Sequence, residues 1–113
     1  MMKVIVAGGR DFIPETEHWD YMEDFIEHNL VSMIVSGKAR GADKFGEDFA
    51  YRYDVGIAEF PADWDTHGKS AGYIRNAEMA DYADALIAFP GGKGTANMIE
   101  VAKKKGLKVF IYG

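Results

Sequence analysis

The chain has 113 residues, of which 48% are hydrophobic and 27% charged, so we expect one globular domain over residues 1–113 and no room for a second. It contains no cysteine, which excludes disulfides, thiolate catalysis and cysteine metal sites and agrees with a reducing compartment. The formal net charge of −5 disfavours long DNA or RNA as a ligand, because nucleic-acid binders usually carry a clustered positive face.

No apolar run approaches the roughly 20 residues needed to cross a bilayer, so no membrane partner is expected. Residues 1–7 are too short a run, and too soon followed by glycine, for a signal peptide. The expected location is therefore the cytoplasm.

Strand and helix signals alternate from the N-terminus onward. Residues 3–7 form a β-branched run of strand length that ends in Gly8-Gly9-Arg10-Asp11. Pro14 and the acidic residues after it suit a helix start. The apolar face of that helix is predicted from residues at helical spacing, namely Trp19, Met22, Ile26 and Leu30.

A second strand is predicted over residues 33–36, and the loop 37–43 leads into a second helix. The apolar stripe of this helix consists of Ala42, Phe45, Phe49 and Tyr53. Residues 55–60 are predicted to form a third strand, nearer a sheet edge because Glu59 is polar.

Residues 62–69 are polar and are expected to be irregular, after which Ser70 can cap a third helix. Arg75 and Asn76 are expected in the first turn of that helix. Residues 84–89 predict a fourth strand, residues 95–105 a fourth helix ended by Gly106, and residues 108–112 a fifth strand.

This alternation predicts an α/β fold, in which right-handed crossovers produce a parallel five-stranded sheet covered by helices on both faces. With the strand order 3-2-1-4-5, the order reverses between the first and fourth strands. Ligands of such sheets bind at the carboxyl edge of the strands, where the order reverses. The loops after residues 7, 36 and 89 would then lie side by side.

The segment Phe89-Pro90-Gly91-Gly92-Lys93-Gly94-Thr95 is the main candidate site. Glycine lets the backbone come close to a ligand, and the free amides and dipole of the next helix favour an anion. The segment matches neither a Walker A sequence nor a dinucleotide fingerprint, and a tight glycine-capped turn would also explain it. Glycines in three neighbouring loops favour a phosphate- or ribose-binding crevice.

The predicted ligand-binding residues come from four segments: Gly8, Gly9 and Arg10; Ser36, Gly37, Gly41 and Asp43; Arg75 and Asn76; and Pro90, Gly91, Gly92, Lys93, Gly94 and Thr95. Cations near the glycine loops, in a chain with acidic residues clustered between 15 and 27, would guide a small anion to a positive pocket.

Several of these side chains have a second interpretation. Arg75 could hold a phosphate bidentately or pair with Glu78 or Asp81. Asn76 could bind a base or ribose or favour the helix start, and Asp43 could accept from ribose hydroxyls or complement the helix dipole. Lys93 could add charge or be solvated at the loop tip, and Arg10 could pair with Asp11.

Two further features were weighed. Trp64 could stack on a base, although an aromatic residue between two aspartates more often covers a core edge. The histidines lie on unrelated segments without metal-ligand spacing, so neither a metal nor a cofactor is expected.

The motifs together resemble the YpsA-like branch of the SLOG superfamily, and the similarity covers nearly the whole chain. The motifs are Gly8-Gly9-Arg10-Asp11-Phe12, Ser36-Gly37-x-Ala39-x-Gly41-Ala42-Asp43, Phe60-Pro61-Ala62-Asp63-Trp64, Ala71-Gly72-x-x-Arg75-Asn76-x-x-Met79 and Phe89-Pro90-Gly91-Gly92-x-Gly94-Thr95. The resemblance implies a Rossmann-like fold and a ligand derived from a nucleotide. It also implies relatives among the LOG phosphoribohydrolases and the DNA-processing protein family.

The LOG enzymes use a Pro-Gly-Gly-x-Gly-Thr-x-x-Glu loop that supplies a catalytic carboxylate. In this chain Met98 occupies the glutamate position, and methionine can neither transfer a proton nor stabilise a cationic centre. Asp43 or Asp11 could replace the glutamate, whereas Glu100 would point elsewhere.

The leading hypothesis is therefore binding, as a sensor or sequestering protein, of a phosphate-bearing nucleotide derivative. The alternative is a nucleoside 5'-monophosphate phosphoribohydrolase in which Arg75, the one catalytic candidate, orients the substrate. Single-stranded DNA binding is disfavoured by the acidic balance. The small size and the aromatic residues on the helices are compatible with a homodimer or larger homo-oligomer.

Overall fold

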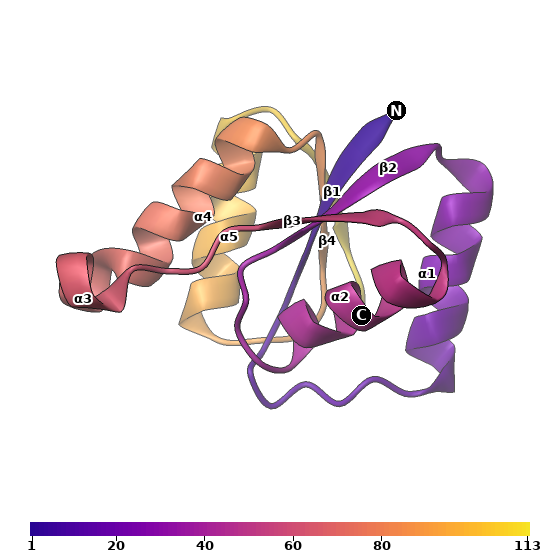
Figure 1. The fold of residues 1–113 in the computed structure, drawn as a ribbon, viewed down its shortest axis with the longest axis horizontal. Helices are drawn as coiled ribbons and strands as arrows, with labels where there is room; N and C mark the ends of the chain where they lie inside the picture. Colours follow the sequence, from indigo (N-terminus) through magenta and orange to yellow (C-terminus); the bar gives the residue numbers. More distant parts are fainter.

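The computed structural model describes residues 1–113 as a five-stranded parallel sheet between two layers of helices (Figure 1). The elements follow in the order β1 (Met2–Ala7), α1 (Thr16–His28), β2 (Val31–Ser36), α2 (Ala42–Arg52), β3 (Gly56–Glu59), α3 (Trp64–His67), the 3-10 helix η1 (Gly68–Ser70), α4 (Ala71–Tyr82), β4 (Ala85–Ala88), α5 (Lys93–Lys104) and β5 (Lys108–Ile111). The strand order β3-β2-β1-β4-β5 confirms the predicted α/β Rossmann-like fold. The same order confirms that β3 is an edge strand.

Successive residues of the central strands face opposite layers, as the strand period of two requires. Val4 and Val6 of β1 pack with α1 and α2, whereas Ile5 and Ala7 pack with α4 and α5. All four residues of β4 are buried, which explains its unbroken apolar sequence.

The two layers differ at the carboxyl edge of the sheet. On the α1 and α2 side, Phe89 is 1% exposed and lies among the rings of Phe12, Phe45 and Tyr112, at centroid distances of 5.0, 5.5 and 5.4 Å. On the other side, β1 and β4 end in the small residues Ala7 and Ala88. The aromatic cluster therefore closes one side of this edge, whereas on the other side the small Ala7 borders open space.

Three local predictions are wrong. Residues 64–70 are helical, because Asp63 caps α3 by accepting a hydrogen bond from the amide of Thr66 at 3.1 Å. Helix α4 continues directly from η1, so Ser70 makes no side-chain cap and Arg75 lies in the second turn. Leu30 is 75% exposed, because α1 ends before it.

The start of α5 also differs from the prediction, since the helix begins at Lys93 and not at Thr95. None of the helices combines the length and hydrophobicity that a bilayer crossing requires.

Helix α2 crosses β1 at a glycine, and this contact yields a prediction. A Cβ atom on Gly46 would lie 2.8 Å from the Cβ atom of Val6, which is buried in a central strand. We expect Gly46→Ala to destabilise the protein, because overpacking costs about 1–3 kcal/mol and exceeds the helix-propensity gain of up to about 1 kcal/mol. Urea unfolding measures the change.

The control is a double-mutant cycle with Val6→Ala. Val6→Ala removes the two methyl groups that would lie 3.2 and 3.3 Å from the new Cβ, and the smaller side chain leaves space into which the remaining Cβ contact can relax. The double variant should therefore be more stable than the sum of the single effects predicts. Strictly additive effects would contradict the contact.

Candidate functional site

A crevice with a volume of about 410 Å³ opens at the carboxyl edge of the sheet, on the side of α4 and α5. Its floor is Ala7 and the loop Gly8–Arg10 that follows β1. The start of α5 forms one wall and α4 forms the other. The loops after β1 and β4 both run along the lower edge of the sheet in Figure 1, where the strand order reverses.

The N-terminus of α5 presents three free amides at this crevice. Gly92 is the N-cap, and the first amide to bond within the helix is that of Ala96, which donates to the carbonyl of Gly92 at 3.0 Å. The amides of Lys93, Gly94 and Thr95 donate to no group in the chain. With the helix dipole they form a site that favours a negatively charged group.

The glycines of the three loops fall into two classes. A Cβ atom on Gly8 would lie 2.7 Å from the Cβ of Ala42, and one on Gly91 would collide with the Thr95 hydroxyl. By contrast, a Cβ atom on Gly92 or Gly94 would meet nothing within 4 Å, although both residues line the crevice. Gly8 and Gly91 form a packing class, because neighbouring atoms leave no room for a side chain. Gly92 and Gly94 form an open class, beside which the protein leaves space unfilled.

Gly9, Gly37 and Gly41 belong with the packing class. A Cβ atom on Gly9 would lie 3.2 Å from the carbonyl oxygen of Pro90, and one on Gly37 would lie 2.5 Å from Nη1 of Arg75. Gly41 has a φ of +77° and caps α2 directly against the backbone of Gly9. The close approach of these loops thus explains the glycines without a ligand.

Arg75 extends from α4 into the crevice, half-buried. Its Nη1 atom donates to the carbonyl of Gly37 and its Nε atom to Oδ1 of Asn76, at 3.1 Å. Nη2 has no partner in the chain. Arg75 makes no ion pair with Asp81, which pairs with Lys105. Burial lowers the pKa of the guanidinium, and the nearby Asp43 opposes that effect.

The side chains of Asn76 and Ser36 are occupied within the protein. Asn76 is 5% exposed, and its Nδ2 atom donates to Oδ1 of Asn97 at 2.9 Å and to the carbonyl of Gly94 at 3.3 Å. Ser36 is buried outside the crevice, where it donates to Glu47 and accepts from the amide of Lys38. Asn76 therefore joins α4 to α5, and Ser36 holds the turn after β2.

Asp43 is the one carboxylate that lines the crevice. It is 7% exposed, and it accepts a hydrogen bond from the amide of Ala39 at 3.2 Å. Burial raises the pKa of the Asp43 carboxyl to about 6, and the Ala39 amide and the charge of Arg75 oppose the shift. Met98 is 1% exposed and also lines the crevice, at the position of the LOG glutamate.

The other carboxylates considered lie elsewhere. The side chain of Asp11 is 95% exposed and pairs with Arg40 at 3.4 Å, not with Arg10. Glu100 points to solvent and pairs with Lys104 at 3.3 Å. Ligand atoms of Glu15, Glu17 and His18 lie within 4.8 Å of one another. Nδ1 of His18, however, already accepts from the amide of Glu15 in a helix-capping box.

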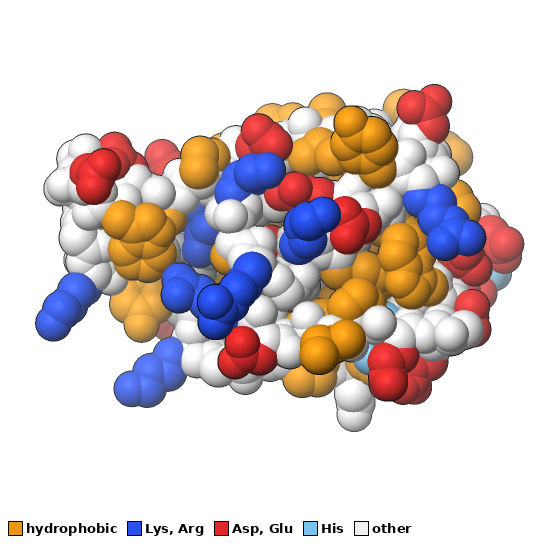
Figure 2. Space-filling model, turned by 60° about the horizontal axis from the view of Figure 1, so that its bottom comes forward, with side chains coloured by type: hydrophobic (Ala, Val, Ile, Leu, Met, Phe, Trp, Pro, Cys, Tyr) orange, Lys and Arg blue, Asp and Glu red, His pale blue; other side chains and the backbone are white.

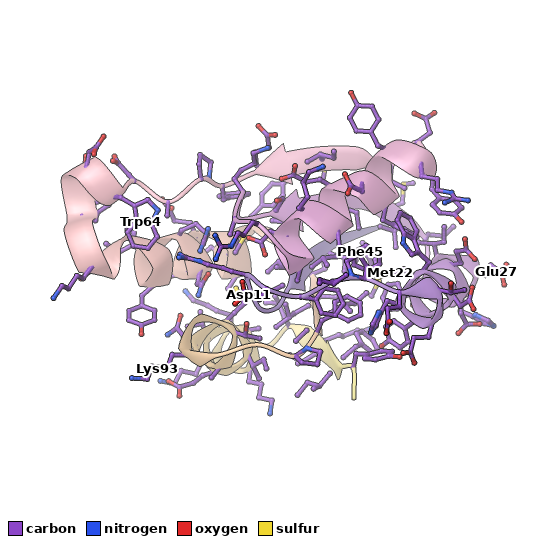
Figure 3. All side chains as sticks on the ribbon, turned by 90° about the horizontal axis from the view of Figure 1, so that it is seen from below. Asp11, Met22, Glu27, Phe45, Trp64 and Lys93 are labelled. Atoms are coloured by element: carbon purple, nitrogen blue, oxygen red, sulfur yellow. The ribbon has the colours of Figure 1, made fainter.

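Trp64, the weaker sequence candidate, lines the crevice from α3 and is 49% exposed. The guanidinium of Arg10 lies 5.8 Å from the centroid of its ring. Figure 3 shows Trp64 above this edge and Lys93 pointing outward at the start of α5. The predicted residues that do not line this crevice are Ser36, Gly37, Gly41, Pro90, Gly91 and Lys93.

Sequence reasoning missed three crevice residues before Arg75, namely Lys69, Gly72 and Tyr73. Lys69 was missed because residues 62–69 were expected to be irregular, whereas Gly72 and Tyr73 lie in the predicted helix but were not assigned to a site. Lys69, Gly72, Tyr73 and Asn76 follow helical spacing, and that pattern could have revealed them.

The lining of the crevice is positively charged on a negatively charged protein. It includes Arg10, Lys69 and Arg75 but only one acidic residue, Asp43. Figure 2 shows Lys and Arg side chains gathered toward the middle and left of this face. This distribution attracts small anions to the edge of the sheet.

Comparison with known proteins places these features in a family. A family model described as the YspA, cpYpsA-related SLOG family (YAcAr) matches residues 2–67, which include β1, β2 and α2 with their loops. The chain is also similar to the gene 61 protein of Mycobacterium phage D29, with 34% identity over 122 aligned positions, covering 100% of this chain and 98% of that protein. No solved structure matches the chain.

The burial of Asp43 predicts a pH dependence of stability. Because the folded state raises the pKa of Asp43 to about 6 from 3.8, the folded state binds the proton more tightly than the unfolded state. Protonation of Asp43 therefore stabilises the folded protein fully below about pH 4. This stabilisation, on the order of 2–3 kcal/mol, is lost as the pH rises through about 6.

Asp43→Asn removes this titration but keeps an oxygen that can accept from the amide of Ala39. The melting temperature of the variant, relative to that of the natural protein, should therefore rise between pH 4 and pH 7. Melting curves followed by circular dichroism measure both. If the difference between the two melting temperatures stays the same from pH 4 to pH 7, burial does not shift the pKa of Asp43.

Proposed function

The chain belongs to the YspA, cpYpsA-related SLOG family, as its motifs predict, and from this premise we propose that it binds a nucleotide or nucleotide-derived small molecule. In this proposal the phosphate of the ligand rests on the first amides of α5. The sugar and base extend along the crevice toward α4 and Trp64.

The observation that carries the proposal is the combination of free amides and unfilled space at the start of α5. Three consecutive amides have no partner, and the two glycines beside them, Gly92 and Gly94, leave room that no side chain occupies. A turn needed only for packing would resemble Gly91, whose missing Cβ is explained by its neighbours. A bound anion explains both features.

The surrounding side chains support the same ligand class. Arg75 leaves Nη2 free, and Lys69 makes no ion pair, so both can neutralise a phosphate. Trp64 offers half of its surface for stacking on a planar base. Asp43 can accept hydrogen bonds from sugar hydroxyls.

A second candidate function, hydrolysis of the N-glycosidic bond of a nucleoside monophosphate, is favoured by Asp43. A general acid or base acts best when its pKa lies near the working pH, and the pKa of Asp43 is about 6. Asp43 stands in the same crevice as Met98, and it can supply the carboxylate that Met98 lacks. Arg75 would orient the substrate through its phosphate.

Binding is tested by thermal denaturation with a panel of phosphate-bearing ligands. A ligand at about 100 times its dissociation constant should stabilise the protein by ~2.7 kcal/mol. Gly94→Val should remove this stabilisation, because the new methyl groups enter the space beside the free amides. The unliganded variant should still fold, since Gly94 is a helical residue with no neighbour in the way.

The matched control is Ala96→Val, which adds the same methyl groups to the exposed side of the same helix, outside the crevice. This variant should keep the full ligand response. If inorganic phosphate, mononucleotides and larger nucleotides all leave the melting temperature of the natural protein unchanged, the proposal is wrong.

Hydrolysis is tested by incubating the protein with nucleoside monophosphates and measuring the free base by chromatography. If the protein is a hydrolase, Asp43→Asn should lower turnover by about 100-fold or more while ligand binding persists. Release of base at the same rate by both proteins would exclude Asp43 as the catalytic group. No release by the natural protein leaves binding as the function.

A further inference from the structure

A second cavity of about 590 Å³ adjoins the crevice on the side of β3. The two cavities share Arg10, Ala39, Trp64 and Arg75, so they meet at these residues. The outer cavity is completed by the loop after β2 and by Pro61 and Ala62 after β3. Each cavity falls within the range of about 300–1,000 Å³ typical of small-molecule sites.

The charges of the outer cavity differ from those of the crevice. Its lining contains four cationic residues, Arg10, Lys38, Arg40 and Arg75, and no carboxylate. Lys38 is neutralised by Glu47 and Glu59, at 3.2 and 3.0 Å, and Arg40 is weakly paired with Asp11. Arg10 and Arg75 have no ion-pair partner, and both stand where the cavities meet.

Two separate positions for negative charge therefore exist along one continuous groove. The first is the start of α5, where the free amides lie. The second is the junction, which Arg10 and Arg75 both line; the charges of both act on the nearby Asp43 carboxyl, but neither forms an ion pair with it. A guanidinium group binds phosphate oxygens through parallel hydrogen bonds. Two neighbouring guanidinium groups repel each other, and an anion bound between them would remove that repulsion.

We infer that the ligand carries at least two phosphate groups and extends through both cavities. A nucleotide whose pyrophosphate linkage joins it to a second sugar would have this form. One phosphate contacts the amides of α5 and the other lies between Arg10 and Arg75. The additional sugar or base enters the outer cavity beside Trp64. This inference rests on the proposed function and narrows its ligand class from nucleotides and their derivatives in general to those that carry two linked phosphate groups.

The test compares inorganic phosphate, AMP, ADP and ADP-ribose by titration calorimetry with the full chain. Charge-assisted hydrogen bonds at the junction should make ADP and ADP-ribose bind at least about tenfold more tightly than AMP. Occupation of the outer cavity should make ADP-ribose bind more tightly than ADP. Arg10→Gln should reduce the advantage of ADP and ADP-ribose over AMP.

Two variants change only the outer cavity. Ala62→Leu should fill this cavity and weaken the binding of ADP-ribose at least about tenfold. The affinity for AMP should stay unchanged. Arg40→Gln, at an exposed position that folding does not require, should weaken ADP-ribose selectively and reduce the salt dependence of its binding. Ala96→Leu, on the exposed side of α5, is the matched control and should change neither ligand.

The outcomes separate this inference from the proposed function. If AMP binds and neither ADP nor ADP-ribose binds more tightly, the two-phosphate inference is wrong and the proposed function stands. If ADP-ribose binds more tightly but Ala62→Leu and Arg40→Gln both leave its affinity unchanged, the outer cavity is not part of the site. If no phosphate-bearing compound binds, the proposed function itself fails.

Discussion

The direct contact between the loops after β1 and β4 is the constraint on which the site depends. The amide of Gly9 donates to the carbonyl of Pro90 at 2.9 Å, and a Cβ atom on Gly91 would overlap the backbone of Gly9. Two chain segments about 80 residues apart therefore lie at backbone distance. This approach fixes the start of α5 beside the end of β1, so that Gly92, Gly94 and Thr95 line the crevice.

The packing of the two helical layers decides on which side of the sheet the crevice opens. Phe89 immediately precedes the loop contact, and the aromatic rings around it fill the α1 and α2 side. On the other side, the small side chain of Ala7 lines the crevice, whereas Ala88 is packed in the core. The crevice thus depends on side-chain size at the end of β1. Its chemistry departs from the LOG pattern, because the carboxylate comes from Asp43 on α2 and the α5 position holds Met98.

The order of strands and helices could be predicted from the sequence because buried parallel strands appear as short apolar runs between helical patterns. The functions of individual loop residues could not. Gly91 and Gly92 are identical neighbours in the sequence, yet one is required by Thr95 and the other faces open space. The link that Asn76 makes between α4 and α5 could not be predicted, because its partner Asn97 becomes a neighbour only in the folded protein. Helix α3 was missed because its four residues, one tryptophan and three polar residues, are too few to carry a periodic signal.

The positions of the two tryptophans have a practical consequence. Trp19 is partly buried against Phe45 and Phe49 on the α1 and α2 side and lines neither cavity, whereas Trp64 is half exposed where the two cavities meet. The indole emission of Trp64 should respond to whatever enters beside it, and that of Trp19 should stay constant as an internal standard. The molecule thus contains its own optical reporter of occupancy, and Trp19→Phe would leave that reporter as the single fluorophore of its kind.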